Sequence, residues 1–253
     1  MVSWHWCLPV LLCASAQAQA VDLHLCVGEK PQLPFIDPSG GGTAGLLIKM
    51  AAQEAGVEIR YFPAPSRRCL EEVRAGDVDG YPVTPYAPAV LTLVGFPMKG
   101  DVPDPARATA VVRTLAYRRV GSSVDWDGKR FTAVVQPVLS QYGSLVIPDR
   151  LKSLQVPMDD HGKSMEANFQ KMLAGRGDIV IGTEAEGRQL VRKPQYAGKI
   201  EALPATFSNA TYYLSLSKRF IAQHGDVAQR LWDAIGRARL TPQYLEATRA
   251  PLD

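Results

Sequence analysis

Residues 23–83 read LHLCVGEKPQLPFIDPSGGGTAGLLIKMAAQEAGVEIRYFPAPSRRCLEEVRAGDVDGYPV, and this stretch decides the fold. Strand-like and helix-like runs alternate along it. The strand-like runs are 23–29, 57–65 and 77–83, and the helix-like runs are 44–56 and 66–76. Gly56 is the expected end of the first helix, and Ser66 is the expected N-cap of the second. Because the links are short, we expect parallel strands with helices packed over the sheet.

A binding site is expected where these strands end, since ligands of such sheets bind beyond the carboxyl ends of the strands. The loops expected there are 29–42, 63–67 and 80–87, and they carry aromatic and polar residues.

This order of segments resembles the amino-terminal half of periplasmic solute-binding proteins of the polar amino-acid type, solute-binding protein family 3. The features in common are the proline-rich loop with Phe35, the G-L-L-x-x-M helix, P-x-P-S-R-R-C-L and G-D-V-D-G. The resemblance resumes in YRRVGSSVDWDGKRFTAVVQ, LAGRGDIVIGTEAEG and TYYLSLSKRF, and it covers nearly the whole chain after residue 20 in the same order. It implies a two-lobed α/β periplasmic-binding-protein-like (type II) fold. Each lobe would be a mainly parallel sheet flanked by helices, with two crossover strands as the hinge.

The expected domains follow from that fold. Residues 1–20 form a signal peptide, 21–111 plus 209–253 form lobe 1, and 112–208 form lobe 2. In lobe 2 we expect strands at FTAVVQ (131–136), SLQVPMD (153–159) and DIVIG (178–182), with a helix at 164–177. A last helix would bury one face, composed of Val227, Leu231, Ile235 and Leu240.

The leader predicts an exported protein. Residues 6–14 are a short apolar core, and Ala18-Gln19-Ala20 is a small-x-small cleavage site, so we expect cleavage after Ala20 and a periplasmic location. The head of the leader lacks Lys and Arg, which leaves the true translation start open.

The remaining composition excludes several classes of function. The net charge is only +3 and the basic residues are scattered, which argues against nucleic-acid binding. His24, His161 and His224 adjoin no G-x-S-x-G elbow and form no metal pair at helical spacing, so we expect neither an enzyme nor a metal or other cofactor.

Cys26 and Cys69 remain after cleavage, and an exported chain with two cysteines favours a disulfide between them. Two buried free thiols are the alternative. A bond across this loop would contribute about 4 kcal/mol by chain entropy.

The charged ligand anchors that the resemblance implies are absent. In the family, an Arg in a T-P-E-R run holds the ligand carboxylate, and an Asp after a strand of the second lobe holds the ammonium group. Here A-P-A-V (87–90) falls at the first position, so that Val90 replaces the Arg, and Thr183 falls at the second, beside Glu184. Three alternatives follow: the ligand is not an ordinary α-amino acid, Arg67 and Glu184 replace the anchors, or ligand binding has been lost.

Aromatic and hydroxyl groups complete the expected site. Four aromatic residues are placed on loops at strand ends and are expected to line the ligand or to pack under those loops. They are Phe35, Tyr81, Tyr86 and Tyr142. The resemblance also implies that the turn from Ser140 to Gly143 leads into a helix and meets the anionic end of the ligand, although Ser140 could simply cap that helix. Glu29 is a further acidic candidate, and the expected ligand-binding set includes it together with Arg67, Thr183 and Glu184.

Three functions remain open. The first is a monomeric venus-flytrap protein that captures a small polar ligand, such as an amino acid, and delivers it to an inner-membrane ABC permease or reports it to a sensor. The second is a periplasmic accessory protein that keeps the fold, with a filled or permanently closed cleft and an exposed apolar patch. The third is a lyase or dehydratase, for which only Glu29 and Glu184 offer a general acid.

Overall fold

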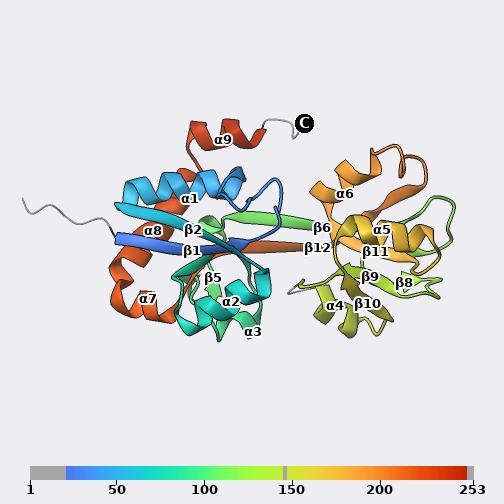
Figure 1. Cartoon of the computed structure of the whole chain (residues 1–253), viewed down its shortest axis with the longest axis horizontal. Helices are drawn as coiled ribbons and strands as arrows, with labels where there is room; N and C mark the ends of the chain where they lie inside the picture. Colours follow the sequence, from blue (N-terminus) through green and yellow to red (C-terminus); the bar gives the residue numbers. More distant parts are fainter. Residues whose placement is uncertain (1–20, 145–146, 250–253) are drawn as a thin grey trace, which may run out of the picture.

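A computed structural model describes residues 21–144 and 147–249 of the chain. Two α/β lobes lie side by side, joined by the long strands β6 and β12 (Figure 1). The two-lobed fold expected from the sequence is therefore present. No helix in the part of the chain that the structure describes is long and apolar enough to cross a membrane.

The strands alternate with helices through both lobes. The strands are β1 (Val21–Gly28), β2 (Val57–Ala64), β3 (Gly80–Pro85), β4 (Met98–Lys99), β5 (Val102–Pro103), β6 (Ala110–Arg119), β7 (Asp125–Trp126), β8 (Phe131–Thr132), β9 (Val138–Gln141), β10 (Met158–Gly162), β11 (Ile179–Thr183) and β12 (Ile200–Leu216). The helices are α1 (Gly42–Ala55), α2 (Ser66–Ala75), α3 (Pro88–Leu91), the 3-10 turn η1 (Pro105–Arg107), α4 (Ile147–Ser153), α5 (Met165–Leu173), α6 (Glu184–Val191), α7 (Lys218–Gln223), α8 (Gly225–Ala238) and α9 (Pro242–Arg249).

One sheet runs through both lobes in the order β10-β9-β11-β6-β12-β3-β1-β2. In lobe 1, β1 is parallel to β2 and β3. In lobe 2, β9 is parallel to β10 and β11. β6 and β12 pair antiparallel, and β12 then pairs with β3 from Tyr212 to Leu216. The two crossover strands are thus the covalent and hydrogen-bonded link between the lobes.

The buried apolar residues form separate clusters on either side of this link. In lobe 1, α1 and α8 cover one face of the sheet, and α2 and α3 cover the other. In lobe 2, α5 and α6 cover one face, while α4 and β7 cover the other. The lobe boundaries at residues 111 and 209 remain our proposal.

Helix ends follow the local sequence in most places. α1 stops at Gly56, which takes the left-handed conformation that suits glycine, as predicted. Val227, Leu231 and Ile235 are buried on α8 as predicted. Leu240 was placed wrongly on this face, because α8 ends at Ala238 and Leu240 is 79% exposed.

The first two strands of lobe 2 were also predicted wrongly. In place of a strand at 131–136, Phe131–Thr132 pairs with β7 in a short hairpin, and the parallel strand is β9. The cause is Asp178, whose carboxylate accepts the backbone N–H groups of Val135 and Gln136 at 2.7 and 2.6 Å and holds that segment as a loop. The second strand is β10 rather than 153–159, since α4 extends to Ser153.

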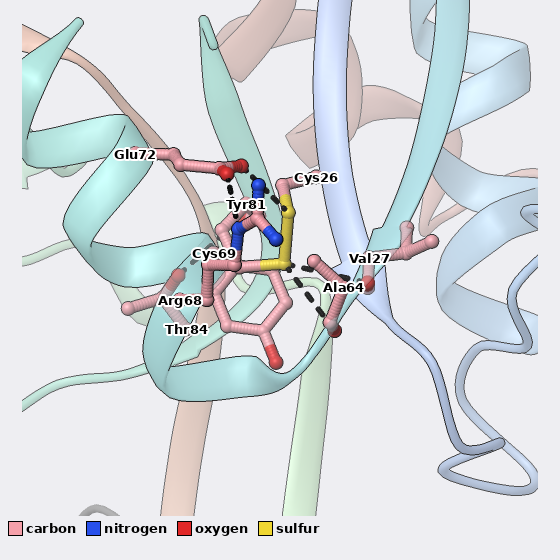
Figure 2. Close-up of a disulfide and its surroundings, with 8 residues drawn as sticks. All are labelled: Cys26, Val27, Ala64, Arg68, Cys69, Glu72, Tyr81 and Thr84. Carbon is pink, nitrogen blue, oxygen red and sulfur yellow. Dashed lines mark hydrogen bonds and ion pairs between the residues drawn. A yellow bond between two sulfur atoms is a disulfide. The ribbon is translucent and has the colours of Figure 1, made fainter. Parts of the chain in front are cut away.

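The Cys26–Cys69 disulfide is present and joins the end of β1 to α2 (Figure 2). Both cysteines are fully buried. The ring of Tyr81 and the Arg68–Glu72 ion pair lie around the bond. The bond therefore fixes α2, the helix whose first turn reaches the interlobe cleft.

Candidate functional site: the interlobe cleft

A group of neutral polar side chains lies in lobe 1 beside the amino end of α2. Tyr81, Ser66 and Gln32 belong to this group. Burial raises the pKa of Tyr81, and hydrogen bonding of its hydroxyl to the side chains of Ser66 and Gln32 opposes the rise. Burial, with a smaller effect of Tyr81, also raises the pKa of Tyr212 to about 12. A Cβ on Gly28 would lie 3.4 Å from Ser66 Oγ, so the backbone of β1 approaches this group closely.

Two of these residues differ from the sequence-based expectation. Tyr81 was placed on a loop, but it is the second residue of β3 and is only 2% exposed. Ser66 was expected to be the N-cap of its helix, but Pro65 takes that position and Ser66 is the first helical residue. Its hydroxyl is therefore directed to Tyr81 instead of capping the helix.

Direct contacts join the two lobes across the cleft. The guanidinium carbon of Arg67, in α2, lies 5.2 Å from the centre of the Tyr142 ring, which follows β9. Lys30 Nζ donates a hydrogen bond to the Lys163 carbonyl at 2.9 Å. Two predicted site residues, Arg67 and Tyr142, are thus brought together. Over residues 21–144 and 147–249, no carboxylate forms an ion pair with Arg67, which leaves its charge available to an anion.

A small cavity of about 110 Å³ also lies between the lobes. Phe35 from lobe 1, Arg113 from β6, and Thr183 and Glu184 from lobe 2 line it. This cavity brings together three further residues of the predicted site: Phe35, Thr183 and Glu184.

The charge of Glu184 is neutralised within the protein. Arg113 Nη1 lies 3.2 and 3.3 Å from its two carboxylate oxygens, and Arg188 Nη2 donates to it at 2.9 Å. Thr183 caps α6 by accepting the Glu186 N–H at 3.3 Å. The sequence reasoning missed Arg113, although a charge in the otherwise apolar run AVVRTLAY could have indicated it.

The other candidates do not join this group. Ser140 is a buried residue of β9 rather than part of a turn before a helix, and its Oγ has no hydrogen-bond partner among the residues that the structure describes. Tyr86 lines a second, larger cavity. The exposed Glu29 donates its backbone N–H to Ala64. Val90 is buried in the core of lobe 1, which is the reason for an apolar residue at that position.

The cleft therefore offers hydroxyl and amide groups together with the Arg67 cation, which has no ion-pair partner among the described residues, while the carboxylate of Glu184 is paired with arginines. In the part of the chain that the structure describes, no cluster of three or more His, Cys, Asp or Glu side chains could hold a metal ion.

Solved structures share this architecture. The GluR0 ligand-binding core from Nostoc punctiforme, in complex with L-glutamate, superposes with a TM-score of 0.67 at 11% identity, covering 89% of this chain and 96% of that one. A histidine kinase sensor domain with similarity to periplasmic binding proteins has a TM-score of 0.68 at 13% identity, covering 90% and 94%. An ancestral arginine-binding protein bound to glutamine has a TM-score of 0.67 at 18% identity, covering 91% and 97%.

No protein-family model matches the sequence. No curated protein matches it either. The structural similarity defines the class: the chain has the two-lobed fold of periplasmic binding proteins and of sensor domains built like them. These neighbours are ligand-binding proteins rather than enzymes.

Proposed function

We propose that the protein is an exported solute-binding protein that captures a small polar ligand in its interlobe cleft, without catalysis. It would pass the ligand to an ABC permease in the inner membrane or report it to a sensor. The proposed signal peptide, cleaved after Ala20, lies outside the described residues.

The observation that carries this proposal is the convergence of polar side chains from both lobes on one cleft. Gln32, Ser66 and Arg67 come from lobe 1, and Tyr142 comes from lobe 2. A ligand that touches both lobes stabilises their closed arrangement, because closure adds contacts that the open state lacks.

A thermal-shift screen tests the proposal. Amino acids, amines, organic acids and small sugars would each be added to the purified protein. A ligand at 100 times its dissociation constant should stabilise the folded protein by about 2.7 kcal/mol. If no compound in these classes raises the melting temperature, the protein is not a receptor for such small molecules.

The role of Arg67 is tested by calorimetry on a compound that the screen identifies. Arg67→Ala should weaken binding by about thirtyfold or more, because a buried charged hydrogen bond is lost, and Arg67→Lys should weaken it less. Arg68→Ala is the matched control, since Arg68 lies on the same turn of α2 and pairs with Glu72. An unchanged dissociation constant in Arg67→Ala would show that Arg67 is a solvated surface residue that does not hold the ligand.

A second candidate is an accessory protein whose cleft serves no free ligand. The direct contacts between the lobes and the small size of the cavity favour it. This second candidate predicts that no compound in the thermal-shift screen raises the melting temperature. It also predicts a gene neighbourhood that contains a sensor or an oxidoreductase in place of a permease and its ATPase.

A further inference from the structure

A second cavity, larger than the one beside Glu184, opens on strand β12. Its volume is about 500 Å³, which is within the range of pockets that bind small organic molecules. Tyr86 and Pro103 of lobe 1, Arg150 of α4 in lobe 2, and Asn209 of β12 are among its lining residues. We call it the β12 cavity.

Among the described residues that line the β12 cavity, Arg150 is the one with a charged side chain. Its guanidinium carbon lies 4.8 Å from the centre of the Phe207 ring and 5.8 Å from that of Trp126. No carboxylate in the described part of the chain forms an ion pair with it, in contrast to Arg113, which is neutralised by Glu184. Aromatic packing therefore holds an uncompensated cation in place at the cavity, and this arrangement favours an anion.

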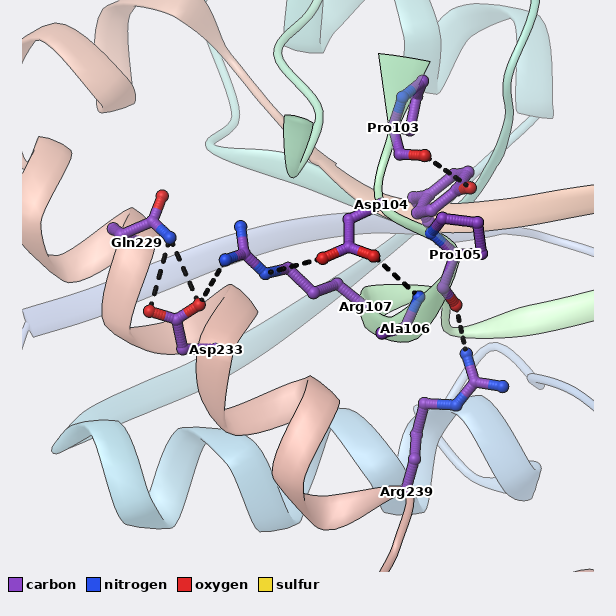
Figure 3. A network of polar contacts seen from close by, with 9 residues as sticks. Pro103, Asp104, Pro105, Ala106, Arg107, Gln229, Asp233 and Arg239 are labelled. Carbon is purple, nitrogen blue, oxygen red and sulfur yellow. Dashed lines mark hydrogen bonds and ion pairs between the residues drawn. The ribbon is translucent and has the colours of Figure 1, made fainter. Parts of the chain in front are cut away.

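The opposite wall is apolar and firmly held. Figure 3 shows the segment from Pro103 to Arg107 attached to the last long helix of lobe 1. Arg107 forms ion pairs with Asp104 at 3.6 Å and with Asp233 of α8 at 2.8 Å. Arg239 donates a hydrogen bond to the Pro105 carbonyl at 3.1 Å. A wall fixed in this way loses little conformational entropy when a ligand packs on it.

Aromatic rings complete the cavity. Tyr86 and Tyr213 each pack edge-on against Phe96, with ring centres 6.0 and 5.9 Å apart. Both tyrosines line the cavity, so it combines flat apolar surface with the Arg150 cation.

We propose that the β12 cavity is a binding site for a small organic anion with an aromatic body, its carboxylate on Arg150 and its ring against Tyr86 and Pro103. Gln32, Ser66 and Tyr81 are not among the described residues that line the site. Asn209, Ser208 and Thr211 on β12 provide polar groups at its floor.

Calorimetry with phenylacetate and its neutral isostere phenylacetamide tests the charge requirement on the unaltered protein. Phenylacetate should bind saturably at one site, and phenylacetamide about tenfold or more weakly. Absence of saturable phenylacetate binding, or equal affinity for the two compounds, would overturn the proposal.

Variants then locate the site. Val102 lies on the rim of the β12 cavity and is 55% exposed, so Val102→Trp should fill the cavity without disturbing the core and abolish binding. Val120→Trp is the matched control, because Val120 is 50% exposed and is not among the residues that line the cavity, and this variant should bind phenylacetate as before.

Arg150→Gln should weaken phenylacetate binding about tenfold or more, whereas Arg176→Gln, at an exposed arginine, should not. Binding that survives in Val102→Trp, or that is lost in Arg67→Ala and kept in Arg150→Gln, would refute the assignment.

Discussion

Breaking the Cys26–Cys69 bond should lower the stability of the fold by a predictable amount. The bond closes a loop with a sequence separation of 43 residues. In the chain-entropy treatment, a loop of this length reduces the entropy of the unfolded chain by about 13 cal/mol/K, equivalent to about 4 kcal/mol at 25 °C. For a chain of this size, that corresponds to a fall in melting temperature of about 8–16 °C.

Urea unfolding with and without a phosphine reductant measures this difference on the unaltered sequence. The reduced protein keeps both sulfur atoms in the core, so its packing is close to that of the oxidised form, and only the cross-link is lost. The double variant Cys26→Ala/Cys69→Ala should be less stable than the reduced protein, because both cysteines are fully buried and the smaller side chains leave a cavity.

Equal free energies of unfolding with and without reductant would refute the reasoning. Thiol titration then distinguishes a bond that does not form from a bond that forms without stabilising the fold. The unfolded, unreduced protein, processed after Ala20, should show no free thiol, and two free thiols would mean that the bond does not form.

Two further predictions concern stability. Gly45→Ala should destabilise the fold by about 1–3 kcal/mol in urea unfolding, since its Cβ would collide with the Gly40 carbonyl oxygen. Gly225→Ala is the control, because its Cβ would enter open space and the substitution should be neutral. Equal effects of the two substitutions on the free energy of unfolding would contradict this reasoning. The pKa of Asp159 is lowered from 3.8 to about 2, and the main cause is the hydrogen bond from Lys171. The ionised Asp159 carboxylate therefore stabilises the folded protein fully above about pH 4, and this stabilisation is lost as the pH falls toward 2. Lys171→Met should therefore make the unfolding free energy less dependent on pH in this window, and an unchanged slope would contradict this.

Much of lobe 1 could be predicted from sequence, because its signals are local. Strand and helix alternate with short links, Gly56 ends α1, and the cysteine pair joins two neighbouring elements of that lobe. Lobe 2 was harder, because Asp178 binds the backbone of Val135 and Gln136 from more than forty residues away and prevents a strand that the apolar sequence favours.

The site was predicted only in part for a similar reason. Phe35, Thr183 and Glu184 meet at one cavity, and Arg67 meets Tyr142, as residues at strand ends should. Arg188 pairs with Glu184 from four residues along α6, which is a local contact, but the contact of Glu184 with Arg113 depends on the three-dimensional pairing of β6 with β11.

The location of a bound ligand is the most direct test of the central claim. A crystal structure of the protein with a compound that stabilises it in the thermal-shift screen should show that compound between the lobes, in contact with the Ser66–Arg67 end of α2 and with Tyr142 or Thr183 of lobe 2. Density for the compound on one lobe alone, away from these residues, would contradict the account.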